Sequence, residues 1–193
     1  MNLIFTLILS LFLYPLLSNG QQSHFNHTIM EVSGDLNKDN LPDKAIVLQD
    51  TLNRDHPYKL QVFFKKPDGK FKLIIESTKA IEPYIPSNHD GYSFDRITIK
   101  KGILSIECSL LRGHYAHKFR YQNENFELIG FSNGGSDGRG TVSTVDFNLS
   151  TGIRIEKSER YDIDKKLTNH TKKVLIRPLP KLQDIVPLEN EYY

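Results

Sequence analysis

YKLQVFFKKPDGKFKLIIES, residues 58–77, is the stretch that decides the fold. Two short runs rich in Phe, Leu, Ile and Val flank Lys66-Pro67-Asp68-Gly69-Lys70, and the Pro-Asp-Gly sequence is typical of a tight turn. Tight turns join antiparallel neighbours, whereas parallel strands need long crossover connections. The stretch therefore predicts a β-hairpin.

The same pattern of short apolar runs and turns continues along the chain. Turns at 100–102, 122–125 and 149–152 separate several of the runs, and no window after Gln21 shows sustained helical spacing. The sequence therefore predicts an all-β fold made of antiparallel meanders. Besides the two runs above, the predicted strands are HTIMEV, KAIVLQ, FDRITIK, ILSIECSL, YAHKFRY, FELIGF, TVSTVDFN and IRIEKSERY.

The predicted strands fall into groups within one domain, residues 21–193. A meander over 26–78 is followed by a Pro-containing link, a meander over 93–132, a hairpin over 140–160 and an extended, Pro-containing arm over 172–193. A small sheet has an apolar face that must be covered. We therefore expect the meanders to pack as a sandwich, or side by side as propeller-blade-like sheets.

The N-terminal segment has the features of a signal peptide. Residues 3–17 form an apolar run that is long enough for a signal-peptide core and short for a spanning helix. Ser18 and Gly20 are small residues that suit cleavage before Gln21, although the segment lacks Lys and Arg and a retained anchor is the alternative. We predict a signal helix over 1–20, a secreted or periplasmic protein, and no stable membrane insertion after cleavage.

Charge and cysteine content narrow the classes of function. The 193 residues include 25 Lys and Arg and 23 Asp and Glu, a net charge of +2, which argues against a nucleic-acid partner. Cys108 is the only cysteine, so no internal disulfide can form. It lies in an alternating apolar run and is expected to be a buried thiol. Without a disulfide, an exported domain must obtain its stability from its hydrophobic core, or from a bound metal.

SGDLNKDNLPDKAIV, residues 33–47, concentrates oxygen-bearing side chains in one turn. Ca²⁺ takes six to eight oxygen ligands, and alternate residues of a tight loop can turn their oxygens to one point. Asn40 occupies the place of the usual Gly, and Ile46 that of the Glu of an EF-hand, so the loop is not an EF-hand. A polar turn without metal, with Lys38 and Lys44 offsetting the carboxylates, is the alternative. The predicted ligands are the side chains of Asp35, Asn37, Asp39 and Asp43 and the carbonyl of Leu41.

The segment GDLNKDNLPDKAIV resembles the calcium loop of FG-GAP and VCBS-type repeats, GDLNGDGxPDLVV. The resemblance implies that the same five residues hold a structural Ca²⁺ at the entry to a β-hairpin. The sequence carries one copy of the loop, whereas a propeller needs several blades. The chain as a whole is similar to small exported proteins of Bacteroidetes-like bacteria.

Other candidate sites have simpler structural interpretations. His114 and His117 are three residues apart on a predicted strand, so they should point to opposite faces rather than form a zinc pair. The segment NGGSDGRG, 133–140, is predicted to be a flexible surface loop that could contact a partner. Strand packing is favoured over ligand stacking for Tyr84, Tyr92, Tyr115 and Tyr121.

No constellation of catalytic residues stands out in the sequence. The predicted function is therefore an exported, calcium-binding, non-enzymatic β-module with a structural role or with a protein or glycan partner. A secreted hydrolase is one alternative. A periplasmic enzyme inhibitor that uses loop 133–140 is the other.

Overall fold

The computed structural model describes residues 24–83, 91–161, 163, 165–187 and 189. The predicted signal peptide over 1–20 and the candidate Tyr84 lie outside the described residues. The described chain forms two antiparallel sheets and one short 3-10 helix, which confirms the predicted all-β class.

The small sheet is the first predicted meander. It contains β1 (Phe25–Gly34), β2 (Asp43–Asp50), β3 (Tyr58–Lys65) and β4 (Phe71–Ser77), paired in chain order. The turn between β3 and β4 closes with hydrogen bonds from Gly69 N to Lys66 O (2.9 Å) and from Lys66 N to Lys70 O (2.8 Å). Gly69 has a φ of 81°, a conformation that glycine adopts at little cost and other residues do not.

The large sheet is a single meander of seven strands. In chain order these are β5 (Ser93–Lys100), β6 (Ile103–Leu110), β7 (Gly113–Gln122), β8 (Asn125–Ser136), β9 (Thr141–Asn148), β10 (Ile153–Arg160) and β11 (Lys165–Lys173). The second meander and the hairpin, predicted as separate groups, thus pair through β8 and β9. β11 lies mostly in a segment for which no strand was predicted.

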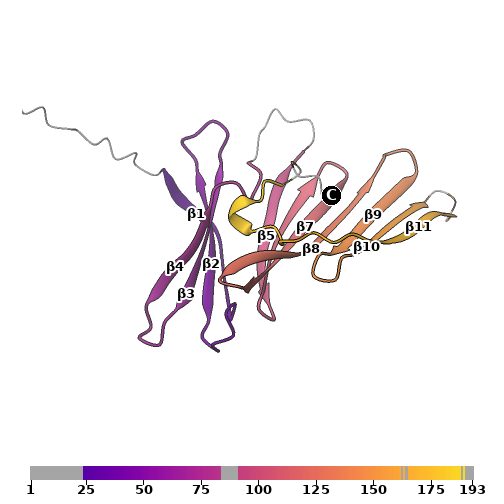
Figure 1. Cartoon of the computed structure of the whole chain (residues 1–193). Coiled ribbons are helices and arrows are strands. Elements are labelled where there is room, and N and C mark those ends of the chain that lie inside the picture. Colours follow the sequence, from indigo (N-terminus) through magenta and orange to yellow (C-terminus); the bar gives the residue numbers. More distant parts are fainter. Residues whose placement is uncertain (1–23, 84–90, 162, 164, 188, 190–193) are drawn as a thin grey trace, which may run out of the picture.

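The small sheet packs against the β5–β8 half of the large sheet (Figure 1). Rings meet across the interface: Phe64 of β3 lies 4.8 Å from Tyr121 of β7 and 6.1 Å from Phe126 of β8, between ring centroids. At one margin β1 contacts β5, where a Cβ on Gly34 would come within 2.5 Å of Ile99 Cγ2. The 3-10 helix η1 (Leu182–Asp184) contacts both β4 and β8 and buries Leu182 there.

The other half of the large sheet, which we call the outer wing (β9–β11), extends away from the small sheet (Figure 1). The C-terminal arm returns from β11 across the sheet to η1, with hydrogen bonds from Val174 N to Gly152 O (2.7 Å) and from Leu128 N to Pro180 O (2.8 Å). Buried apolar side chains anchor this arm: Ile176, Leu179, Leu182 and Ile185.

The prediction of a flexible loop over 133–140 is wrong for its first half. β8 continues to Ser136, and Gly134 and Gly135 pair with β7 on one side and β9 on the other. The turn is limited to the residues after Ser136, where Asp137 Oδ1 accepts hydrogen bonds from Arg139 N (2.7 Å) and Thr141 N (2.9 Å). The glycines permit close packing: a Cβ on Gly113 would lie 2.2 Å from Gly134 O.

Candidate functional site

The predicted calcium loop, residues 35–43, connects β1 to β2 at the margin where the two sheets meet. Leu36 is only 1% exposed and belongs to the core shared by both sheets. The backbone of Asp35 lies beside the β5–β6 turn, since a Cβ on Gly102 would be 3.6 Å from Asp35 O. The loop therefore contacts both sheets and does not project freely into solvent.

Side-chain oxygens fold the loop by capping its own backbone. Asp35 accepts hydrogen bonds from Lys38 N (2.6 Å) and Asn40 N (3.0 Å), and Asp39 Oδ1 accepts one from Leu41 N (2.8 Å). Lys38 and Asn40 have φ values of 68° and 65°, which bend the chain sharply. Asn at position 40 suits the left-handed conformation better than most residues do.

Asp43 ties the loop to the body of the small sheet. Its buried carboxylate accepts hydrogen bonds from Leu36 N (2.8 Å) and from Lys65 N at the end of β3 (3.0 Å). Burial raises the pKa of Asp43, the backbone amides oppose the increase, and the nearby charge of Asp39 adds to it. The carboxylates of the loop are thus close enough to repel each other.

Lys44 does not neutralise this repulsion. Its Nζ forms an ion pair with Glu31 on β1 and lies 4.9 Å from the centroid of the Phe71 ring. One of the two lysines that the sequence offered as counter-charges is therefore directed to the sheet. A bound cation would remove the remaining repulsion between Asp39 and Asp43.

The loop fits Ca²⁺ in the chemistry of its donors. Each of the four side chains, and the Leu41 carbonyl, can provide an oxygen, the ligand type that Ca²⁺ prefers. Several of these oxygens accept backbone hydrogen bonds, and within the described ranges no three His, Cys, Asp or Glu side chains form a metal-binding group. Occupancy would therefore require Asp35 and Asp39 to turn oxygens away from backbone amides and towards the ion.

The two histidines of β7 point to opposite faces, as their spacing predicts. His114 is exposed, whereas His117 is fully buried in a cluster with Tyr115, Phe119 and Phe131, at ring centroid distances of 5.3–6.3 Å. Burial lowers the pKa of His117 to about 4, so the ring is neutral at physiological pH. They do not form a zinc pair.

Cys108 and two of the candidate tyrosines belong to the core. Burial raises the pKa of the Cys108 thiol to about 11, which leaves it protonated and inert. Tyr115 is 1% exposed, and Tyr121 packs against Phe64 and Phe126. These positions provide packing, as predicted.

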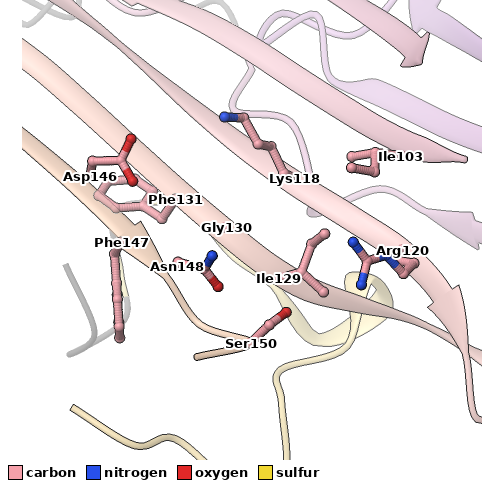
Figure 2. Close-up of a pocket in the computed structure, with 10 residues that line it drawn as sticks. All are labelled: Ile103, Lys118, Arg120, Ile129, Gly130, Phe131, Asp146, Phe147, Asn148 and Ser150. Carbon is pink, nitrogen blue, oxygen red and sulfur yellow. The ribbon is translucent and has the colours of Figure 1, made fainter. Parts of the chain in front are cut away.

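A hollow of about 270 Å³ lies on the outer face of the large sheet, the face turned away from the small sheet (Figure 2). Its floor is the backbone of Gly130 in the middle of β8. Lys118 and Asn148 are the cross-strand partners of Gly130 on β7 and β9, so their side chains stand on either side of it. The lining is Ile103, Lys118, Arg120, Ile129, Gly130, Phe131, Asp146, Phe147, Asn148 and Ser150.

The charged side chains of the hollow are available to bind a ligand. Within the part of the chain that the structure describes, the side chains of Lys118, Arg120 and Asp146 form no ion pair or hydrogen bond. A second hollow of about 360 Å³ adjoins the first and shares Arg120 and Ser150 with it. Sequence reasoning missed this site, because its residues are ordinary polar positions until the register of β7, β8 and β9 is known.

No described helix has both the length and the apolar character needed to cross a membrane. Comparisons with protein-family models, with curated proteins and with solved structures find no match to the chain. The function is therefore inferred from the geometry of the chain itself.

Proposed function

We propose that the protein is an exported β-module that Ca²⁺ stabilises and that binds a partner molecule without catalysing a reaction. The observation that carries the calcium half of the proposal is the position of loop 35–43. It gathers oxygen donors at the margin where the two sheets meet, with Leu36 in the core common to both.

Ca²⁺ at this position would act as a clamp. It would hold together loop segments that contact β1, β2, β3 and the β5–β6 turn, and it would relieve the repulsion between Asp39 and Asp43. A ligand that binds only the folded state raises stability in proportion to the logarithm of its concentration. Exported proteins meet abundant calcium, so even a weak site would fill.

Thermal unfolding with calcium and with chelator tests the clamp. We expect calcium to raise the Tm of the wild-type protein and chelator to lower it, and we expect Asp39→Asn to reduce that difference. This substitution keeps an oxygen that can accept the hydrogen bond from Leu41 N, and it removes from the proposed ligand set one charge and the acceptor of the hydrogen bond from Asn37 Nδ2.

Asp137→Asn is the matched control, since Asp137 also caps backbone amides in an exposed turn but lies outside the loop. It should leave the calcium response unchanged. A Tm that is the same with calcium and with chelator in the wild-type protein would reject the clamp.

The two alternatives have less support. A hydrolase needs a pair of carboxylates, or a nucleophile and a base, in one cavity. Among the described residues that line the hollow of Figure 2, Asp146 is the sole carboxylate and histidine is absent. The loop offered as an inhibitory element is shorter than predicted, because β8 takes up residues 133–136.

A further inference from the structure

We propose that the hollow over Gly130 binds a monoanionic sugar unit, such as a hexuronate, through Lys118 and Arg120. This inference rests on the binding half of the proposed function and is independent of calcium. It names both the site and the chemical class of the ligand.

The floor of the hollow has a glycine at its centre, flanked by two polar side chains. Lys118, Gly130 and Asn148 form one row across β7, β8 and β9, so the outer two are separated by two strand spacings, about 10 Å. Gly130 has no side chain, so the centre of the row is a depression bordered by the methylene groups of Lys118, which would lie 3.4–3.9 Å from a Cβ at this position. The register shift beside it leaves Ile129 as the extra residue of a β-bulge, a feature that often accompanies binding sites.

The balance of charge indicates one negative charge on the ligand. Lys118 and Arg120 contribute two positive charges to the lining and Asp146 contributes one negative charge, which leaves a net charge of +1. Glu127, the cross-strand partner of Arg120, and Arg177 line the adjoining hollow and leave this sum unchanged. Arg binds a carboxylate through two parallel hydrogen bonds, and Lys adds a point charge. A doubly charged phosphate monoester would meet the repulsion of Asp146.

The remaining polar groups suit the hydroxyl groups of a sugar. Asp146 can accept hydrogen bonds, and Ser150 can both donate and accept them. Asn148 Oδ1 already accepts a hydrogen bond from Thr151 N (3.1 Å), which fixes the side chain and leaves its NH₂ group as a donor. The hollow thus combines an anion site with donors and acceptors at its rim.

The C-terminal arm holds one wall of the hollow in place. Arg177 donates hydrogen bonds to Leu149 O (3.0 Å) and Ser150 O (2.8 Å), and so fixes the turn that carries Ser150. Because its guanidinium group is bound to carbonyl oxygens, the role of Arg177 is to position this turn. The adjoining hollow, which shares Arg120 and Ser150, has room for a neighbouring sugar of an oligosaccharide.

Titration of the full folded domain with glucuronate and with glucose tests the proposal, because the two sugars differ only at C6. We expect glucuronate to shift the NMR signals of the Gly130 and Asn148 amides in a saturable manner, and glucose to leave them unchanged. Absence of saturable shifts with glucuronate would overturn the proposal. Inorganic phosphate that binds as tightly as glucuronate would overturn the assignment to a sugar.

Three substitutions should each weaken glucuronate binding at least tenfold, namely Lys118→Ala, Arg120→Gln and Gly130→Val. The three atoms nearest to a Cβ at residue 130 belong to the Lys118 side chain, at 3.4–3.9 Å, so the β-carbon that Gly130→Val adds to the floor would meet a flexible side chain first. Lys66→Ala removes the same charge from an exposed turn of the small sheet and should have no effect. Wild-type affinity for glucuronate in both Lys118→Ala and Gly130→Val would overturn the location of the site.

Asp39→Asn separates this proposal from the calcium clamp. The folded Asp39→Asn protein should bind glucuronate as the wild-type protein does, even if its response to calcium is lost. Loss of glucuronate binding in this variant at a temperature where it is folded would contradict the independence of the two sites.

Discussion

The two halves of the large sheet share one hydrogen-bonded ladder but differ in what covers them. In the half formed by β5–β8, one face is buried under the small sheet, with Ile97, Ile106 and Phe119 at 1% exposure or less. In the outer wing, Ile153, Tyr161 and Leu167 are 38–57% exposed, and every described side chain of β11 is exposed. β9 still contributes Phe147, which is 1% exposed, to the core, whereas no described side chain of β10 or β11 is buried. The same strand geometry therefore persists in β10 and β11 without a core.

The difference shows that pairing, turns and charged contacts hold β10 and β11, whereas burial holds the covered half. Glu156 on β10 forms ion pairs with Arg154 on the same strand (2.7 Å) and Lys172 on β11 (2.8 Å). Such partly exposed contacts contribute little compared with a buried apolar side chain. We expect the covered half to determine global stability and the wing to open first.

The largest expected effect comes from the same substitution made in each half. Leu104 on β6 is 0% exposed and Leu167 on β11 is 47% exposed. Leu104→Ala should lower the free energy of unfolding by about 2–5 kcal/mol, because it removes buried methyl groups and leaves a cavity. Leu167→Ala should change it by less than about 0.5 kcal/mol. Urea unfolding measures both, and equal losses would show that the wing carries as much of the stability as the core.

The second-largest expected effect is the dependence of stability on pH, which comes from His117, the histidine buried in the covered half. The pKa of His117 is lowered to about 4 in the folded state, below its ordinary value of 6.5, so the unfolded state takes up the proton first. Stability should therefore fall as the pH drops from 6.5 towards 4, and this contribution should level off below about 4. The full loss is about 3 kcal/mol, because the pKa of His117 falls from 6.5 to about 4 and a tenfold change in proton affinity is worth about 1.4 kcal/mol.

Urea unfolding of His117→Phe between pH 7 and pH 4 checks this assignment. The part of the acid sensitivity that His117 causes should disappear, since phenylalanine does not titrate and suits the surrounding aromatic cluster. His170→Phe makes the same change at an exposed histidine of the wing and is the matched control. If the pH dependence of the His117 variant matched the wild type, another buried group would have to be responsible.

Most strands could be predicted from the sequence because one buried face imposes alternation. Ten runs of β-branched and aromatic residues lie within strands β1 to β10, apart from Tyr161 at the end of the last run. KKLTNHTKK escaped prediction because β11 buries neither face and so has no apolar period. Gly134 and Gly135 were misleading for another reason. Glycine usually indicates a turn, but here it allows β7 and β8 to approach closely.

The two candidate sites likewise differ in whether the sequence alone could reveal them. The loop over 35–43 is local, so its spacing of Asp35, Asn37, Asp39 and Asp43 was visible in the sequence. The hollow is not local, because it arises from three strands and from a bulge that places Gly130 between Lys118 and Asn148. Its residues are ordinary solvent-facing positions in each strand taken alone. The sequence alone could not reveal the hollow, because it does not give the register of β7, β8 and β9.

The smallest expected effect tests whether the contacts of Glu156 join the strands of the wing. The ammonium of Lys172, followed by the guanidinium of Arg154, lowers the pKa of Glu156 from 4.5 to about 2. The contribution of Glu156 is thus present above pH 4.5 and is lost as the pH falls towards 2. An NMR titration of the side-chain carboxyl group should show the low pKa, and 1 M salt should move it upwards by screening.

Lys172→Ala should raise the pKa of Glu156 towards its ordinary value. Lys173→Ala is the matched control, because Lys173 is the next residue and alternation places its side chain on the opposite face of β11. The control should leave the pKa nearly unchanged. Equal increases in the two variants would mean that Glu156 responds to the general positive charge of β11. The wing would then be held by its backbone ladder alone, without a specific contact between β10 and β11 side chains.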